Sequence, residues 1–445
     1  MSARVRTVLA LGLPIIGAMV SQNVLNLVDL AMVGTLGDAA VAAVGIGGFA
    51  NFLATAFITG LSAGVQAMSA RRLGEGRSHE TALPLNGALL LALLIGIPWS
   101  VLLFGLVDSA FPILNADPDV VAAGVPYLEA RILAVVAVGM NFAFRGYWNG
   151  INLPRLYLRT LLVMHACNIF FNWVFIFGKL GAPALGAAGA GVSSAIATYI
   201  GTATYVVLGL RHARAGGFLA GLPTRDTIQT ILRLAVPTGF QQLSFAAGFT
   251  ALFWIIGHSG PDLQQNTAEV AAANAVVNVT LVALLPGIAL GIAAASLVGQ
   301  ALGRKNVEDA RQWAWDVVRV AVVVMGLLGL PMLLAPDLIL SAFLHDESTL
   351  AVARAPLRLV GGAIAVDAVG LVLMHALLGA GASRLTMTVS IATQWGVFLP
   401  VAYLLGPVLG YGLFPIWTAH IGYRLLTALV FFVLWQRGRW AEIEV

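Results

Sequence analysis

Charged side chains are scarce in this sequence of 445 residues. Asp, Glu, Lys and Arg together make up 10% of it, whereas soluble domains carry about 25%. Hydrophobic residues make up 59%, and Cys167 is the single cysteine, which excludes a disulfide within the chain. The short alternating segments of an outer-membrane barrel are also missing. The composition therefore predicts an all-α integral membrane protein.

Motifs for catalysis and nucleotide binding are missing as well. The sequence contains no Walker A loop, no HExxH, no pair of CxxC motifs and no GxSxG elbow. We therefore expect no enzyme, no cofactor and no metal centre. Without a nucleotide site the chain is not a self-contained ATP-driven pump, so transport would draw on a gradient of H⁺ or Na⁺.

Long apolar stretches fill most of the chain, and a helix needs about 20 such residues to cross a bilayer. The stretches predict twelve membrane spans, near residues 8–35, 40–70, 82–111, 120–150, 156–178, 187–210, 229–258, 267–302, 310–335, 348–381, 386–407 and 412–436. The first apolar run continues past Pro14 to Gly34 with no convincing cleavage site. We therefore expect an uncleaved first span rather than a signal peptide.

Basic residues are spread over the short loops that follow every second span, whereas the opposite loops are richer in Asp. This bias predicts that both termini lie in the cytoplasm. Because the bias accounts for the net charge of +4, no nucleic-acid partner is needed. The partner that the composition demands is the lipid bilayer.

The two halves of the chain repeat each other. Three positions return at a spacing of 223 and two at a spacing of 229: Pro14 as Pro237, Gly34 as Gly257, Gly37 as Gly260, Gly150 as Gly379, and Arg155 as Arg384. Secondary transporters are commonly built from such repeats. We therefore expect an N-terminal six-helix bundle over 1–210, a cytoplasmic linker over 211–227 and a C-terminal six-helix bundle over 228–445.

Asp29 is an acid inside the first expected span, where an ionisable group costs about 2.5–3.5 kcal/mol. Gln22, Asn26 and Asp29 are spaced four and three residues apart, so they lie on one stripe of a helix. We expect Gln22 and Asn26 to line a cavity and Asp29 to titrate during transport. Pro14 favours a kink in the same helix, and protonation could select between two bends. The alternatives are an acid that only hydrogen-bonds between helices and a proline that only shapes packing.

Other polar residues inside the spans are further candidates. Asn168 and Asn172 lie four residues apart in the fifth span and could hydrogen-bond a carboxylate or ligate a cation, or could simply join two helices. Asp367 lies mid-way along the tenth span with His375 two turns later, and it is the second candidate for ion coupling. Asp316 lies near a cytoplasmic helix end with two arginines on its own helix, and we expect a structural ion pair there.

At these residues the chain resembles the MATE (multidrug and toxic compound extrusion) family of cation-coupled exporters, in its bacterial DinF-like branch with some NorM-like features. The resemblance covers essentially the whole chain. It is carried by NLVDLAMVGTLG (26–37), RRLGEG (71–76), FGKLGAPALGAAGAGVSSAIAT (177–198) and ALLGAGASR (376–384). The resemblance implies two pseudo-symmetric six-helix bundles that work by alternating access.

In such proteins the acid of the first span is a proton or sodium site close to polar residues of the fifth. The resemblance gives this function to Asp29, with the two asparagines of span 5 beside it and Pro14 at the bend. The DinF-like branch has Asp where this chain has Asn172. The NorM-like branch has an acid that matches Asp367 and also a Glu in the seventh span. This chain has Gln241 and Gln242 early in that span but no Glu within it. We expect Gln241 in the cavity.

We therefore expect a monomeric antiporter of the bacterial inner membrane that exports organic, cationic and amphipathic compounds in exchange for H⁺. Three alternatives stay open: coupling to Na⁺, a flippase for lipid-linked precursors, and an intramembrane enzyme. A flippase would line its cavity with several basic residues for phosphates. An enzyme would need a nucleophile and a base within reach of each other.

Overall fold

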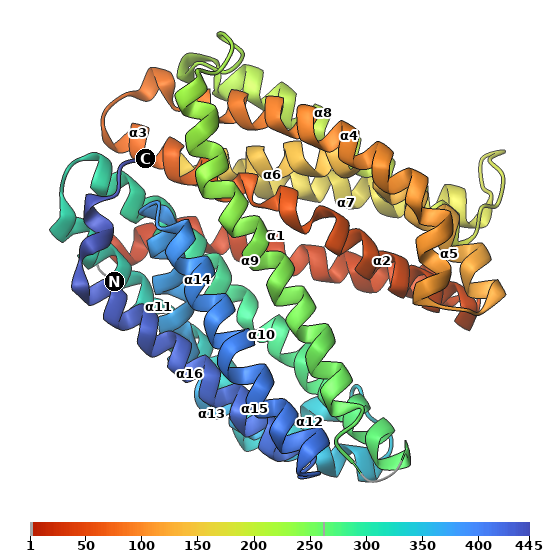
Figure 1. Cartoon of the computed structure of the whole chain (residues 1–445). Helices are drawn as coiled ribbons and strands as arrows, with labels where there is room; N and C mark the ends of the chain where they lie inside the picture. Colours follow the sequence, from red (N-terminus) through yellow and green to blue (C-terminus); the bar gives the residue numbers. More distant parts are fainter. Residues whose placement is uncertain (1–2, 261–262) are drawn as a thin grey trace. The chain divides into compact units, whose positions relative to one another are not determined.

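The computed structural model describes residues 3–260 and 263–445, and over these residues the chain is helical without a β-strand (Figure 1). The helices of the first half are α1 (Ala3–Gly34), α2 (Asp38–Thr59), α3 (Leu61–Gly74), α4 (Leu83–Leu114), α5 (Pro118–Ile132), α6 (Val135–Gly150), α7 (Pro154–Phe177) and α8 (Ala187–His212). Those of the second half are α9 (Arg225–Ile256), α10 (Leu263–Gly303), α11 (Val307–Leu334), α12 (Pro336–Leu340), α13 (Glu347–Gly379), α14 (Ser383–Thr393), α15 (Leu399–Tyr403) and α16 (Leu413–Arg437).

The expected spans are confirmed. Within the described ranges, eleven segments are long and apolar enough to cross a membrane, and the bent pair α5–α6 brings the number to twelve. The two helices of that pair meet at 49°. All observed bounds lie within about five residues of the expected ones, because apolar runs of about 20 residues define membrane helices well.

Turn chemistry explains where individual helices begin and end. Asp117 caps α5, because its Oδ1 accepts a hydrogen bond of 2.9 Å from the backbone N–H of Asp119, and Pro118 opens the helix. The helix α7 stops at Gly178, whose φ of +66° is the left-handed conformation that favours glycine. The loops between spans are therefore specified locally.

Contacts divide the chain into two compact units. The first unit contains Gly17–Gly239, and the second unit contains Met1–Ile16 together with Phe240–Val445. The division differs from the expected bundles over 1–210 and 228–445 at two places: the first part of α1 packs with the second half, and the first part of α9 packs with the first half. In both helices the change follows two residues after a proline, Pro14 and Pro237.

Proline explains this exchange physically, because its ring removes one hydrogen bond of the helix and allows a change of direction. Before Pro14, Gly12 lies against the side chain of Leu290 on α10. Before Pro237, the carbonyl of Ala235 lies against Gly60, where a Cβ atom would stand 2.2 Å from the oxygen. Each proline thus separates a helix segment that packs in one unit from a segment that packs in the other.

The expected linker over 211–227 is docked on the first unit rather than loose. The Asn86 side chain donates to the carbonyl of Gly217 at 2.9 Å and accepts from the backbone N–H of Leu219 at 3.0 Å. Phe218 is 2% exposed. Because the segment buries a ring and pairs its backbone, it extends the core of that unit.

The repeat seen in the sequence is also a repeat of packing. A Cβ atom on Gly150 would lie 2.9 Å from the carbonyl oxygen of Gln66, and one on Gly379 would lie 2.2 Å from that of Ala295. Gln66 and Ala295 are themselves 229 residues apart, the spacing of the two glycines. Both halves therefore use a glycine at the same place to bring two helix backbones together.

Candidate functional site

The polar stripe of α1 contains a hydrogen bond between two of its side chains. Nε2 of Gln22 donates to Oδ1 of Asn26 at 3.1 Å, one turn along the helix. Asp29 follows after three more residues and is half-buried. All three residues belong to the first unit, in which α7 supplies the partners of the stripe.

Asp29 is joined to both asparagines of α7. Nδ2 of Asn172 donates to Oδ1 of Asp29 at 2.6 Å and to Oδ1 of Asn168 at 3.0 Å. Nδ2 of Asn168 in turn donates to the Ser194 hydroxyl of α8 at 3.0 Å. Asn168 and Asn172 are 2% and 0% exposed. The result is a buried line of amides that ends on a carboxylate, so the amide nearest Asp29 is held in place by the rest of the line.

One atom of this line is not satisfied. Oδ1 of Asn172 is buried and has no hydrogen-bond partner among the described residues, although most buried polar atoms in proteins have one. The same amide already uses both of its N–H groups. An acceptor atom therefore stands free beside an acid that can gain or lose a proton.

His165 also belongs to the site, and the sequence reasoning missed it. Its Nε2 lies 3.3 Å from Oε1 of Gln22, so α7 contacts the stripe at two levels. His165, Asn168 and Asn172 follow one another at intervals of three and four residues, which places them on one face of α7. This spacing is the signal that was available.

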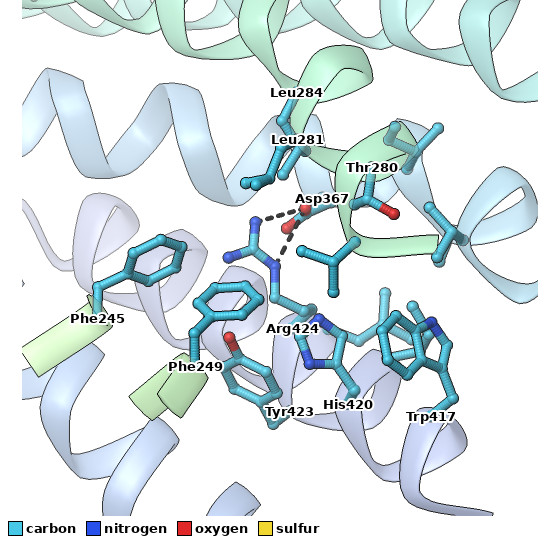
Figure 2. A pocket seen from close by; sticks show the side chains of 16 residues that line it. Phe245, Phe249, Thr280, Leu281, Leu284, Asp367, Trp417, His420, Tyr423 and Arg424 are labelled. Atoms are coloured by element: carbon cyan, nitrogen blue, oxygen red, sulfur yellow. Dashed lines mark hydrogen bonds and ion pairs between the residues drawn. The ribbon is translucent and has the colours of Figure 1, made fainter. Parts of the chain in front are cut away.

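Asp367 of α13 lies in the second unit, and its partner is an arginine rather than His375. Nε and Nη2 of Arg424, on α16, lie 3.1 and 2.5 Å from Oδ2 of Asp367 (Figure 2). Nδ1 of His375 instead lies 2.8 Å from the carbonyl of Leu371 on its own helix. The sequence reasoning missed Arg424, although a single basic residue inside an apolar span is as conspicuous as an acid.

Three other candidates lie outside these two clusters. Gln241 donates to the Ser390 hydroxyl at 2.9 Å and does not line the cavity of Figure 2. Pro14 lies fifteen residues before Asp29 and marks the change of unit in α1. Asp316 forms ion pairs with Arg319 at 3.0 Å and with Arg4 at 2.5 Å, so the structural pair expected there is present.

The two halves carry their polar clusters at different places of the repeat. At the spacings of 223 and 229, Asp29, Asn168 and Asn172 correspond to Leu252, Val397 and Val401. Asp367 corresponds to Val138. The two halves therefore share the glycine packing of the repeat but carry their polar clusters at different positions in it.

No group of three His, Cys, Asp or Glu side chains is arranged for a metal ion in the part of the chain that the structure describes. Around Asp29 the oxygen donors are one carboxylate and the amide oxygens of Asn168 and Asn172. Such donors suit a proton or a hard monovalent cation, since hard cations take oxygen ligands.

Repeated halves of membrane-crossing helices with an acid on a buried polar line define the class of a secondary transporter. The sequence model of the MatE family matches residues 14–174 and again residues 237–404. The two matches begin at Pro14 and Pro237, so they follow the repeat. The chain belongs to the MATE family, and it is a multi-pass membrane transporter of small molecules, not an enzyme.

Curated relatives align over nearly their whole length. The "Probable multidrug resistance protein NorM" of Mesorhizobium japonicum is 28% identical over 447 residues, which cover 97% of this chain and 94% of that protein. The protein of the same name from Neisseria meningitidis serogroup B is 26% identical over 431 residues, with 96% and 92% covered. The family assignment therefore applies to the full chain.

Solved structures agree on the fold. A structure described as an outward-facing conformation of a multidrug resistance MATE family transporter of the MOP superfamily has a TM-score of 0.90 at 20% identity, with 100% of this chain and 98% of that one covered. A MOP superfamily transporter from Pyrococcus furiosus has a TM-score of 0.87 at 20% identity, with 99% and 96% covered. At this identity the likeness concerns the fold alone.

Proposed function

We propose that this chain exports amphipathic organic compounds across the bacterial plasma membrane in exchange for inward H⁺, with Asp29 as the coupling acid. The chain works as a monomer by alternating access, with both termini in the cytoplasm. The hydrogen bond from Asn172 to Asp29 carries the proposal. It ties a titratable group to a buried line of neutral amides.

A proton on Asp29 changes what its neighbours can do. The ionised carboxylate accepts the N–H of Asn172, whereas a protonated carboxyl can also donate a hydrogen bond. If the amide of Asn172 turns over, its free Oδ1 becomes the acceptor for that proton. Asp29 and Asn172 thus have one hydrogen-bonding pattern for each charge state, which is what a two-state coupling site needs.

The charge of Asp29 is not cancelled by a contacting cation. The bonded neighbours are amides, and the basic group whose charge acts on it is Arg131 of α5, without an ion pair between them in the described ranges. Asp367, in contrast, is already paired with Arg424. Of the two acids predicted for coupling, Asp29 is therefore the one that can exchange H⁺ for a cationic substrate.

Competition between the proton and the substrate accounts for antiport. If an organic cation binds near the ionised Asp29, protonation weakens that binding and substrate binding expels the proton by the same free energy. The curated relatives are named as multidrug resistance proteins, in line with cargo that is recognised by charge and apolar surface. A hydrophobic region with one acid selects for this chemistry rather than for one compound.

The test is transport in proteoliposomes. Efflux of a fluorescent organic cation such as ethidium is followed under an imposed pH gradient and, separately, under a sodium gradient. We expect the pH gradient to drive efflux by the wild type, Asp29→Asn to abolish it, and the neutral double variant Asp367→Asn/Arg424→Gln to retain coupling.

Other results assign another function. Efflux driven by the sodium gradient alone would replace H⁺ by Na⁺. If neither gradient moved any cargo across a broad panel, drug export would be the wrong reaction and a flippase for lipid-linked precursors would become the better candidate. Loss of coupling in the double variant, with full coupling in Asp29→Asn, would move the coupling site to the second unit.

A further inference from the structure

The second unit contains a cavity of its own, lined by residues of α9, α10, α13 and α16 (Figure 2). Its wall is mostly apolar and aromatic. Phe245 and Phe249 stand on one side, with ring centroids 4.9 Å apart and ring planes at 71°, and Trp417 stands on another. Such a wall suits a flat ring, since aromatic side chains pack well in edge-to-face and offset arrangements.

An ion pair is set into this apolar wall. Arg424 and Asp367 are 18% and 13% exposed, so both charges are largely withdrawn from solvent. Charged residues inside membrane segments are costly and usually mark a functional site. The pair needs an explanation beyond packing, because two apolar side chains of similar volume would join α13 to α16 as well.

Arg424 has donors to spare. Its contacts with Asp367 use Nε and Nη2, and both go to the same carboxylate oxygen. Tyr423 also interacts with the guanidinium. A guanidinium carries five N–H groups, and in Figure 2 its remaining nitrogen points away from Asp367, toward the side of Phe245 and Phe249. The cation is therefore held by one edge and presents another to the cavity.

Other polar atoms of the wall lack partners. Within the described part of the chain, Nε1 of Trp417 and Nδ1 of His420 are buried without a hydrogen bond, and both residues line this cavity. The indole nitrogen is a donor only, like the nitrogens of Arg424. A buried donor without an acceptor is unfavourable. The open nitrogen of Arg424 and the indole N–H of Trp417 are both donors, so the ligand group that matches either of them is an acceptor.

We propose that this cavity binds an aromatic compound that carries a carboxylate. Arg424 holds the carboxylate, and the ring packs against Phe245 and Phe249. An oxyanion can bind the open edge of Arg424 without breaking the ion pair with Asp367. The inference goes beyond the proposed export cycle, because it holds whichever ion drives transport and is tested at equilibrium without a gradient.

The experiment is a binding titration of the purified full-length protein in nanodiscs. Three probes of one shape are compared: 1-naphthoate, 1-naphthylmethylammonium and neutral 1-naphthalenemethanol. Quenching of tryptophan fluorescence reports binding. We expect 1-naphthoate to bind at least tenfold more tightly than either of the other probes.

Two variants locate the site. The double variant Asp367→Asn/Arg424→Gln removes both charges and leaves no unpaired ion. We expect it to lower the affinity for 1-naphthoate at least tenfold and to leave the affinity for the neutral probe unchanged. Asp367→Asn alone frees the whole guanidinium, so we expect it to bind 1-naphthoate more tightly than the wild type. Size-exclusion profiles and melting temperatures identify any variant that fails to fold.

Three outcomes would overturn the proposal. Equal affinity for the three probes would show that the cavity does not select an anion. Unchanged 1-naphthoate binding in a folded double variant would place the anion site elsewhere. No binding of 1-naphthoate by the wild type, together with a lower melting temperature of the double variant, would leave the ion pair a purely structural link.

Discussion

Nδ2 of Asn172 lies 2.6 Å from Oδ1 of Asp29, across the contact between α7 and α1. A hydrogen bond donated to a carboxylate favours its ionised form. Asn172 itself is fixed by Asn168, which is fixed by Ser194. The charge state of one acid is thus set by a short line of buried neutral side chains.

The variant Asn172→Ala tests this relationship. Without the amide donor the carboxylate of Asp29 keeps its proton to higher pH, so the midpoint of the pH profile of transport should rise by about one unit. The measurement is efflux from proteoliposomes at a series of pH values with a constant gradient.

Asn278→Ala is the matched control, because Asn278 of α10 donates within its own helix, to Asn274. We expect its pH midpoint to equal that of the wild type. If the pH midpoint of transport by Asn172→Ala equalled that of the wild type, or lay at lower pH, the side chain of Asn172 would not be hydrogen-bonded to the group that titrates.

The close contact between Gly60 and Ala235 gives a second prediction. A methyl group on Gly60 would stand 2.2 Å from the carbonyl of Ala235, so Gly60→Ala must push two helices apart. We expect it to lower the free energy of unfolding by about 1–3 kcal/mol. Thermal unfolding in detergent, followed by circular dichroism, measures the change.

Gly45 provides the comparison in α2. No described atom lies within 4 Å of a Cβ atom built on it, so Gly45→Ala should be neutral or stabilise by up to about 1 kcal/mol, the difference in helix propensity. Equal melting temperatures for the two variants would show that the first part of α9 does not pack closely on the first unit.

A third prediction concerns the first part of α1. Arg4 forms ion pairs with Asp309 at 2.9 Å and Asp316 at 2.5 Å, and its guanidinium lies 3.9 Å from the ring centroid of Trp313. All of these residues belong to the second unit. Arg4→Gln should destabilise that unit by about 1 kcal/mol, since each partly exposed pair contributes about 0.2–1 kcal/mol.

The control is Arg6→Gln, because Arg6 is exposed and has no ion pair among the described residues. Urea unfolding at low and high salt separates the electrostatic contribution of Arg4 to stability from its packing contribution. The difference between the two variants should shrink at 1 M salt, which screens surface charges. If both variants had the same free energy of unfolding at low salt, the packing of the first part of α1 on the second half would be unsupported.

Much of the fold could be predicted from the sequence because its determinants are local. Twelve apolar runs predicted the membrane spans, and the repeated prolines and glycines predicted two related halves. The division into units was harder. It depends on which helices flank α1 and α9 on either side of Pro14 and Pro237, and such distant contacts leave no mark on the periodicity of one sequence.

The sites divide in the same way. The stripe of Gln22, Asn26 and Asp29 follows from helical spacing, whereas the partnership of Asp29 with Asn172 was implied only by a family resemblance. The pairing of Asp367 with Arg424 spans 57 residues and was missed. The spacing of residues along one helix shows which side chains share a face of that helix. It does not show which other helix packs against that face.

The most direct test of Asp29 as the coupling acid is the release of protons on substrate binding. Ethidium is added to the purified protein in weakly buffered detergent, and a pH-sensitive dye records the protons released. The wild type should release about one proton for each ethidium bound, as coupled binding requires, and so should the folded double variant Asp367→Asn/Arg424→Gln. Asp29→Asn should release none. Proton release from Asp29→Asn equal to that of the wild type would contradict the account.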